Sequence, residues 1–273
     1  MIAGREIALG ALSVPGASVW QSIDAASDAG FDSLGLRVFD DTADEPNPLV
    51  ADVAFRRETI ARLQHHGLAV LDVEVVRLNE RTNTEACRTA LECAAALGAR
   101  AVLVVGWDDD ETRAIESFRA LCEAAAEFGL RPALEFMAFS AVRDLGQAQR
   151  IVDAACHPAG GVLIDALHLR RSGAEPADVE AFVASHCERV VYAQLCDAPL
   201  AGPPARKSGL AEAAADRLAP GEGELPLRCF IDALPAGVPL SIEAPIAALA
   251  SLSPSARANY VMKATRRLLT GER

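Results

Sequence analysis

The sequence lacks an apolar run of about 18 residues, the least that a membrane-crossing helix needs, although 51% of its 273 residues are hydrophobic. Its first residues, MIAGREIALG, contain neither the basic segment nor the long apolar segment of a signal peptide. These two absences argue against a transmembrane helix and a secretory leader. We therefore expect a cytoplasmic protein with no membrane partner.

Positive charge is scarce as well. The chain has 26 basic and 38 acidic residues, a formal net charge of −12, and only five histidines. Such a field repels phosphate backbones and anionic membrane surfaces. We therefore expect no nucleic-acid partner.

No C-x-x-C pair occurs, and the seven cysteines are an odd number scattered along the chain. A chain of this length can bury a large core without disulfides, so we interpret the cysteines as reduced, mostly buried thiols. The same length is acceptable for one α/β barrel, and we expect a single domain over residues 1–273.

Glycine, in contrast, recurs at a regular place. Four times a helix-like segment, a glycine and a short apolar strand follow one another, at Gly30, Gly67, Gly98 and Gly129. A glycine just past a helix supplies its left-handed cap. Ser18-x-x-Gln21 and Thr82-x-x-Glu85 fit the capping box that begins a helix.

The same pattern predicts eight strands, separated by helices. They lie near residues 5–11, 32–38, 69–76, 101–106, 132–137, 161–165, 190–196 and 239–244. We also expect a loop over 198–225 and helices near 226–234 and 254–270. Eight alternations predict an α/β fold, a single (β/α)₈ TIM barrel. A doubly wound sheet is the alternative, but "LGALSVPGAS" is not its G-x-G-x-x-G phosphate turn.

Polar residues of inward parity stand late in these strands. They are Arg37, Glu74, Glu135, Asp165, Gln194 and Glu243. Strand ends of a barrel carry its catalytic groups, and the three carboxylates of the last four strands, Glu135, Asp165 and Glu243, repel one another where they converge. We interpret the convergence as a divalent metal site, the alternative being acids that pair with Arg37 or stay hydrated. Without metal, Asp165→Ala is then expected to raise thermal stability, because it relieves repulsion.

Five short motifs carry a resemblance to a known family. They are "LEFM" with Glu135, "IDALH" with Asp165 and His168, "AQLCD" with Gln194 and Asp197, "RLAPGEGELPL" at 217–227, and "SIEAP" with Glu243. In order and spacing the chain resembles the xylose-isomerase-like barrels from its second strand to its eighth. That family includes ketohexose epimerases, hydroxypyruvate isomerase, inosose dehydratase and 3-dehydroshikimate dehydratase, with endonuclease IV as a distant relative.

The resemblance implies one divalent ion held by four strands, with Glu135, Asp165, Gln194 and Glu243 as its ligands. The family's motif at the third position is H-x-x-D, whereas this chain has Gln194-x-x-Asp197. All four predicted ligands then offer oxygen, which favours Mg or Mn over Zn or Co. The resemblance also places His168 against substrate.

Four further residues are candidates for substrate binding, each with a simpler interpretation. Arg37 and Glu74 contact substrate or form an internal ion pair. Trp107 walls the pocket or covers the core, and Arg206 lies in a loop that either covers the mouth or is merely exposed.

The chemistry implied by the resemblance is proton removal next to a carbonyl, with Glu135 and Glu243 as the catalytic pair. A proton relay between carbons or faces makes a sugar isomerase or epimerase. Loss of a β-hydroxyl makes a dehydratase of an inosose or 3-dehydroshikimate-like compound. The expected partner is a small polyhydroxy carbonyl substrate, and a homodimer or homotetramer stays open.

Two other classes of function are less favoured. An endonuclease IV-like nuclease needs a three-metal cluster with several histidines, whereas the remaining histidines fall on predicted helices or their ends. The other class is a metal-free, non-catalytic barrel. Its best support is Gln194, which stands where the family has a metal-binding histidine.

Overall fold

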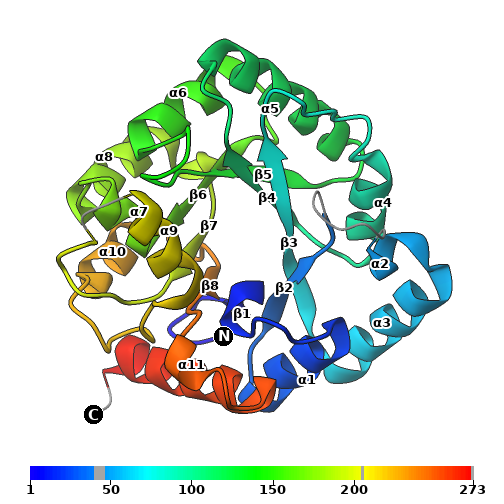
Figure 1. Cartoon of the computed structure of the whole chain (residues 1–273), viewed down its shortest axis with the longest axis vertical. Helices are drawn as coiled ribbons and strands as arrows, with labels where there is room; N and C mark the ends of the chain where they lie inside the picture. The colour runs from blue at the N-terminus through cyan, green and yellow to red at the C-terminus, as the bar shows by residue number, and fades with distance from the viewer. Residues whose placement is uncertain (40–46, 204–205, 272–273) are drawn as a thin grey trace.

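The computed structural model describes residues 1–39, 47–203 and 206–271, and residues 206 and 207 by their backbone alone. Within these residues eight parallel strands form a closed barrel in chain order, and β8 pairs back with β1 (Figure 1). The strands are β1 Ile7–Leu9, β2 Ser33–Arg37, β3 Ala69–Leu78, β4 Ala101–Gly106, β5 Arg131–Glu135, β6 Gly161–Asp165, β7 Val190–Leu195 and β8 Leu240–Ile242. The predicted TIM barrel is confirmed.

Helices surround the barrel, and α11 at the end of the chain packs beside α1 (Figure 1). They are α1 Val19–Ala29, α2 Pro48–Ala51, α3 Val53–His66, α4 Arg88–Ala96, α5 Glu111–Ala126, α6 Leu145–Ala155, α7 Ala166–Arg171, α8 Pro176–His186, α9 Arg206–Ala215, α10 Leu227–Ala233 and α11 Pro254–Thr270. No helix in the described part of the chain is both long and apolar enough to cross a membrane.

The predicted helix boundaries are confirmed where local chemistry determines them. Ser18 and Gln21 form the capping box of α1. The four recurring glycines have φ between +65° and +77°, the left-handed conformation that ends a helix without a Cβ penalty. The second predicted capping box is wrong, because α4 begins only at Arg88 and the Thr82 hydroxyl instead accepts a hydrogen bond from the Asn79 backbone.

The predicted loop over 198–225 contains a helix, α9, at Arg206–Ala215. Its sequence, RKSGLAEAAA, is rich in alanine, the strongest helix former. The prediction gave more weight to the surrounding prolines and glycines than to this short segment.

Strand register positions the polar residues at one end of the barrel. Gln194 of β7 lies beside Asp165 of β6 on one side and Ser241 of β8 on the other. Glu135 and Asp165 are the last residues of β5 and β6, and Glu243 directly follows β8. The carboxyl ends of these strands therefore bring the predicted site residues together.

Candidate active site

A cavity of about 170 Å³ opens at this end of the barrel. Six of the predicted site residues line it: Arg37, Glu74, Trp107, Glu135, His168 and Glu243. Its size suits a small molecule and not a polymer. Arg217, which the sequence analysis did not single out, lines it as well.

Asp165 has two structural partners in this site. It is the N-cap of α7, and its Oδ1 accepts hydrogen bonds from the backbone N–H groups of Leu167 at 2.7 Å and His168 at 3.0 Å. Its Oδ2 accepts a bond from Nη1 of Arg217 at 2.7 Å, and the residue is fully buried. A helix N-terminus and an arginine thus stabilise the charge of Asp165.

The Arg217 guanidinium bridges two of the predicted metal ligands. Nη1 contacts Asp165, and Nη2 lies 3.1 Å from Oε2 of Glu243. Nε donates to the Ala213 carbonyl at 2.8 Å, so the group is held on several sides while its side chain is only 2% exposed. The expected carboxylate repulsion is therefore partly neutralised by the chain itself, which removes the reason for expecting Asp165→Ala to be stabilising.

Arg217 is held in place by its neighbours in the chain. The adjacent Leu218 exchanges two backbone hydrogen bonds with Asp197, at 2.7 and 2.8 Å. The Asp197 carboxylate accepts bonds from the backbone N–H groups of Gly221 and Leu225. The sequence signal for this arginine was its position at the start of the 217–227 motif, three residues before Pro220-Gly221.

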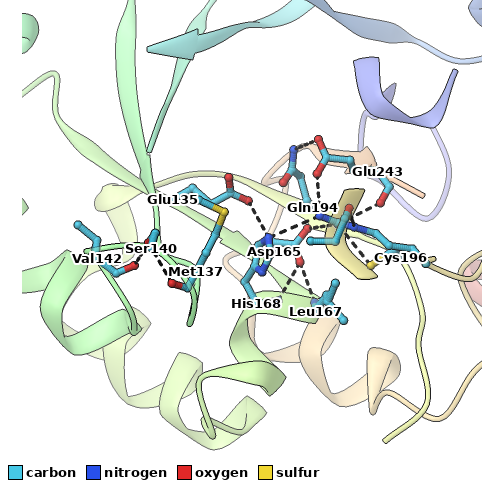
Figure 2. A network of polar contacts seen from close by, with 12 residues as sticks. Glu135, Met137, Ser140, Val142, Asp165, Leu167, His168, Gln194, Cys196 and Glu243 are labelled. Carbon is cyan, nitrogen blue, oxygen red and sulfur yellow. Dashed lines mark hydrogen bonds and ion pairs between the residues drawn. The ribbon is translucent and has the colours of Figure 1, made fainter. Parts of the chain in front are cut away.

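Gln194 uses its amide nitrogen to orient Glu243, while its amide oxygen lacks a hydrogen-bond partner among the described residues. Its Nε2 donates to Oε1 of Glu243 at 2.9 Å (Figure 2). Its Oε1 is buried and has no hydrogen-bond partner among the described residues. A buried acceptor without a partner is costly, which points to a ligand or water at that atom.

Glu135 and His168 face each other beside Asp165 (Figure 2). Oε1 of Glu135 lies 3.7 Å from Nε2 of His168, and the rings of His168 and Phe139 form a T-shaped contact with centroids 5.5 Å apart. Glu135, Asp165 and His168 each offer one ligand atom, all within 4.8 Å of one another. This buried triad could hold a metal ion, and it differs from the predicted set in including His168.

Three further predicted residues, Arg37, Glu74 and Trp107, line the cavity. Nε of Arg37, whose side chain is 58% exposed, lies 3.1 Å from Oε1 of buried Glu74, so both the internal pair and the position against the cavity are present. Trp107 lies tilted against Phe139, with ring centroids 6.3 Å apart, and makes the wall apolar. Arg206 begins α9, but its side chain lies outside the described part of the chain.

Burial and neighbouring charge raise most of the carboxyl pKa values here. Burial, then Glu243 and Asp165, hold the pKa of Glu135 well above its usual value. Burial, together with Glu74 and Asp165, raises the pKa of Glu243 to about 8 against the opposing effect of Arg217. Each acid can therefore carry a proton near neutral pH, as a general acid must.

The pKa values of Asp165 and His168 are lowered instead. Burial acts to raise the pKa of Asp165, but Arg217 and His168 outweigh it and the pKa lies below its usual value. Burial lowers the pKa of His168 to about 4. The imidazole is therefore neutral near pH 7, the form that can accept a proton or bind a metal.

The raised acids predict a pH dependence of stability. In the unfolded chain carboxyls titrate near pH 4, whereas burial raises the pKa of Asp72 and of Glu74 to about 7 in the fold. Between about pH 4.5 and 7 the folded state then binds more protons than the unfolded chain, so the contribution of these two acids to the free energy of unfolding falls as the pH rises through that range and levels off above it. His168 acts in the opposite direction, because its imidazole is neutral in the fold but becomes protonated in the unfolded chain below about pH 6.5, and this single group offsets only part of the fall.

Urea unfolding at several pH values, with a chelator present, measures this slope. Asp72→Asn mimics the protonated acid and does not titrate. It should make the slope of unfolding free energy against pH less steep by up to about 1.4 kcal/mol per pH unit, the contribution of one proton. A wild-type stability that is level or rises across the window would contradict the shifts.

Solved structures share this architecture across nearly their whole length. The IolI protein, solved with a bound zinc atom, is 16% identical with a TM-score of 0.82, over 97% of this chain and 98% of that one. AsbF of Bacillus anthracis, a probable 3-DHS dehydratase, is 13% identical with a TM-score of 0.74, over 95% and 98%. D-allulose 3-epimerase from Methylomonas sp., in complex with D-allulose, is 17% identical with a TM-score of 0.68, over 97% and 98%.

At these identities the likeness establishes the fold alone. No curated protein matches the chain significantly. A family model, the xylose isomerase-like TIM barrel, matches residues 23–267, nearly the entire barrel. The chain belongs to the xylose isomerase-like TIM barrel family.

Proposed function

We propose that the chain is a metal-dependent isomerase or epimerase of a small keto-sugar or polyol-derived carbonyl compound. The observation that carries the proposal is the pair Glu135 and Glu243, two buried acids that line one small cavity. Two acids that face one bound substrate can act one as base and the other as acid.

The proposed reaction begins with the transfer of one proton. The ionised member of the pair takes it from the carbon next to the carbonyl; the C–H electron pair becomes the C=C bond of an enediolate, and the π pair of the carbonyl moves onto its oxygen. For epimerisation, the protonated member returns a proton to the opposite face of the same carbon. For isomerisation, it returns the proton to the former carbonyl carbon, while the hydroxyl proton of the neighbouring oxygen passes to the former carbonyl oxygen, so that the carbonyl forms again on the neighbouring carbon. Arg37 and Glu74 are positioned to bind hydroxyl groups, and Trp107 limits water on one side.

The residues present fit a divalent cation at this site. Two observations support the fit: Glu135 and Asp165 offer ligand atoms within 4.8 Å of each other, and Oε1 of Gln194 is buried without a partner among the described residues. We propose that Glu135, Asp165, Gln194 and Glu243 hold the ion and that His168 contacts substrate. When bound, a divalent ion supplies a Lewis acid that polarises the substrate carbonyl. An oxygen-only set favours Mg or Mn.

A dehydratase is the second candidate. It shares the first proton removal and then needs an acid to protonate a leaving hydroxyl. Glu243 lines the cavity, where it can supply that proton. The fold likeness to AsbF makes this alternative worth a direct test.

Isotope exchange tests both candidates. The protein is incubated in D₂O with Mg or Mn and a panel of ketoses, inososes and hydroxy-keto acids, and each product is followed by NMR and mass. Deuterium at the carbon next to the carbonyl, with an isomer formed, supports the isomerase. Loss of one water identifies the dehydratase. No exchange in any panel member, with metal shown to be bound, contradicts the proposal.

Gln194→His tests the ligand set. An imidazole in place of the amide oxygen should raise the affinity for Zn²⁺ relative to Mn²⁺, because nitrogen ligands suit zinc better. Calorimetric titration of both proteins with both ions gives this ratio. His168→Gln is the matched comparison, and its ratio should stay that of wild type. If the Zn²⁺/Mn²⁺ affinity ratio falls in His168→Gln and is unchanged in Gln194→His, the ion is assigned instead to the triad of Glu135, Asp165 and His168.

A further inference from the structure

The Arg217 guanidinium contacts two carboxylates that the proposed metal ion also needs. Nη1 lies 2.7 Å from Oδ2 of Asp165, and Nη2 lies 3.1 Å from Oε2 of Glu243. The second oxygen of each carboxylate is engaged as well, by the α7 backbone for Asp165 and by Gln194 for Glu243. Neither carboxylate therefore has an oxygen without a partner.

We propose that Arg217 and a divalent cation compete for Asp165 and Glu243, so that the guanidinium leaves these carboxylates when the ion binds. This inference rests on the four-ligand set proposed above. The site then has two charge-balanced states, one neutralised by the chain's own cation and one by the metal.

Electrostatics favours the exchange. A guanidinium and a divalent ion that shared both carboxylates would be two like charges a short distance apart in a buried, low-dielectric site, where repulsion is strong. Leaving either carboxylate without a cation is also costly. Binding of the ion is therefore coupled to release of Arg217, and the measured metal affinity includes the cost of that release.

The cavity offers space for the displaced Arg217 guanidinium. Arg217 lines the cavity itself, together with Leu210, Ala213 and Ala214 of α9. Its head group can therefore turn toward the cavity, and so toward bound substrate, without its backbone leaving the pairing of Leu218 with Asp197.

Arg217→Met tests the competition by removing the charge while keeping an unbranched side chain. Calorimetric titration with Mn²⁺ should show at least tenfold tighter binding than in wild type. Arg257→Met is the matched control, because Arg257 is also buried but donates to the Pro15 carbonyl on the α11 side, and it should bind Mn²⁺ as wild type does. Arg217→Lys, which keeps a positive charge, should fall between wild type and Arg217→Met.

A second measurement uses the wild-type protein, in case Arg217→Met does not fold. With ¹⁵N-labelled arginine, the Nε resonance that Arg217→Lys removes is followed as Mg²⁺ or Zn²⁺ is added. Saturating metal should shift it, and the Arg257 resonance should stay in place.

The outcomes separate this inference from the proposed function. Metal binding by wild type with an unchanged or weaker Mn²⁺ affinity in Arg217→Met overturns the competition alone and leaves the metal-dependent function standing. An Nε resonance unmoved at saturating metal has the same meaning. No binding by any of the proteins overturns both the competition and the metal-dependent function.

Discussion

Asp165→Ala should lower the free energy of unfolding by about 3–5 kcal/mol, the usual cost of removing one partner of a buried ion pair. The variant leaves the buried Arg217 guanidinium with a single carboxylate, Glu243. It also leaves the N–H groups of Leu167 and His168 without their cap. Relief of carboxylate repulsion offsets only part of this loss. Urea unfolding with a chelator present measures the effect.

Asp144→Ala is the matched control for the capping contribution. Asp144 caps α6 through a hydrogen bond from the backbone N–H of Gln147 at 2.8 Å, at an exposed position with no buried arginine. It should cost about 1 kcal/mol, as other caps do. Equal losses in the two variants would show that the pairing of Asp165 with Arg217 contributes little, and a more stable Asp165→Ala would restore the repulsion argument.

Glu135→Gln and Glu243→Gln should each reduce deuterium exchange into substrate on the order of 10²-fold or more, the typical contribution of a general acid or base. Glutamine keeps the shape and an oxygen ligand but cannot carry the proton. The measurement is the exchange rate with a substrate found in the panel, at saturating Mn²⁺, with metal content determined in every variant.

Glu6→Gln is the control for these two variants. Glu6 pairs with Arg100 and accepts a bond from Ser33, the first residue of β2, so it lies at the opposite end of the barrel. Its exchange rate should equal that of wild type. Near-normal exchange in both Glu135→Gln and Glu243→Gln, with metal bound, would remove these two acids from the chemistry.

The sequence by itself determined the barrel and the end at which its polar residues gather. Helix ends depend on a left-handed glycine or a capping hydroxyl within a few residues, and Gly30 and Ser18 stand where these interactions need them. Strand alternation has a period of two, so Glu135 and Asp165 could be assigned to the inner face from their own strands alone. Both kinds of signal are local.

Only the tertiary structure decided how the charges at that end are balanced. Arg217 is 52 residues from Asp165 and 26 from Glu243 in the sequence. It follows helix α9, and both lie in the range 198–225 that was predicted to be a loop. Its position depends on the pairing of Leu218 with Asp197 and on the helix α9 that precedes it. No periodicity links these segments. A buried charge takes whichever partner the folded chain brings within reach, and that proximity arises only when the barrel closes.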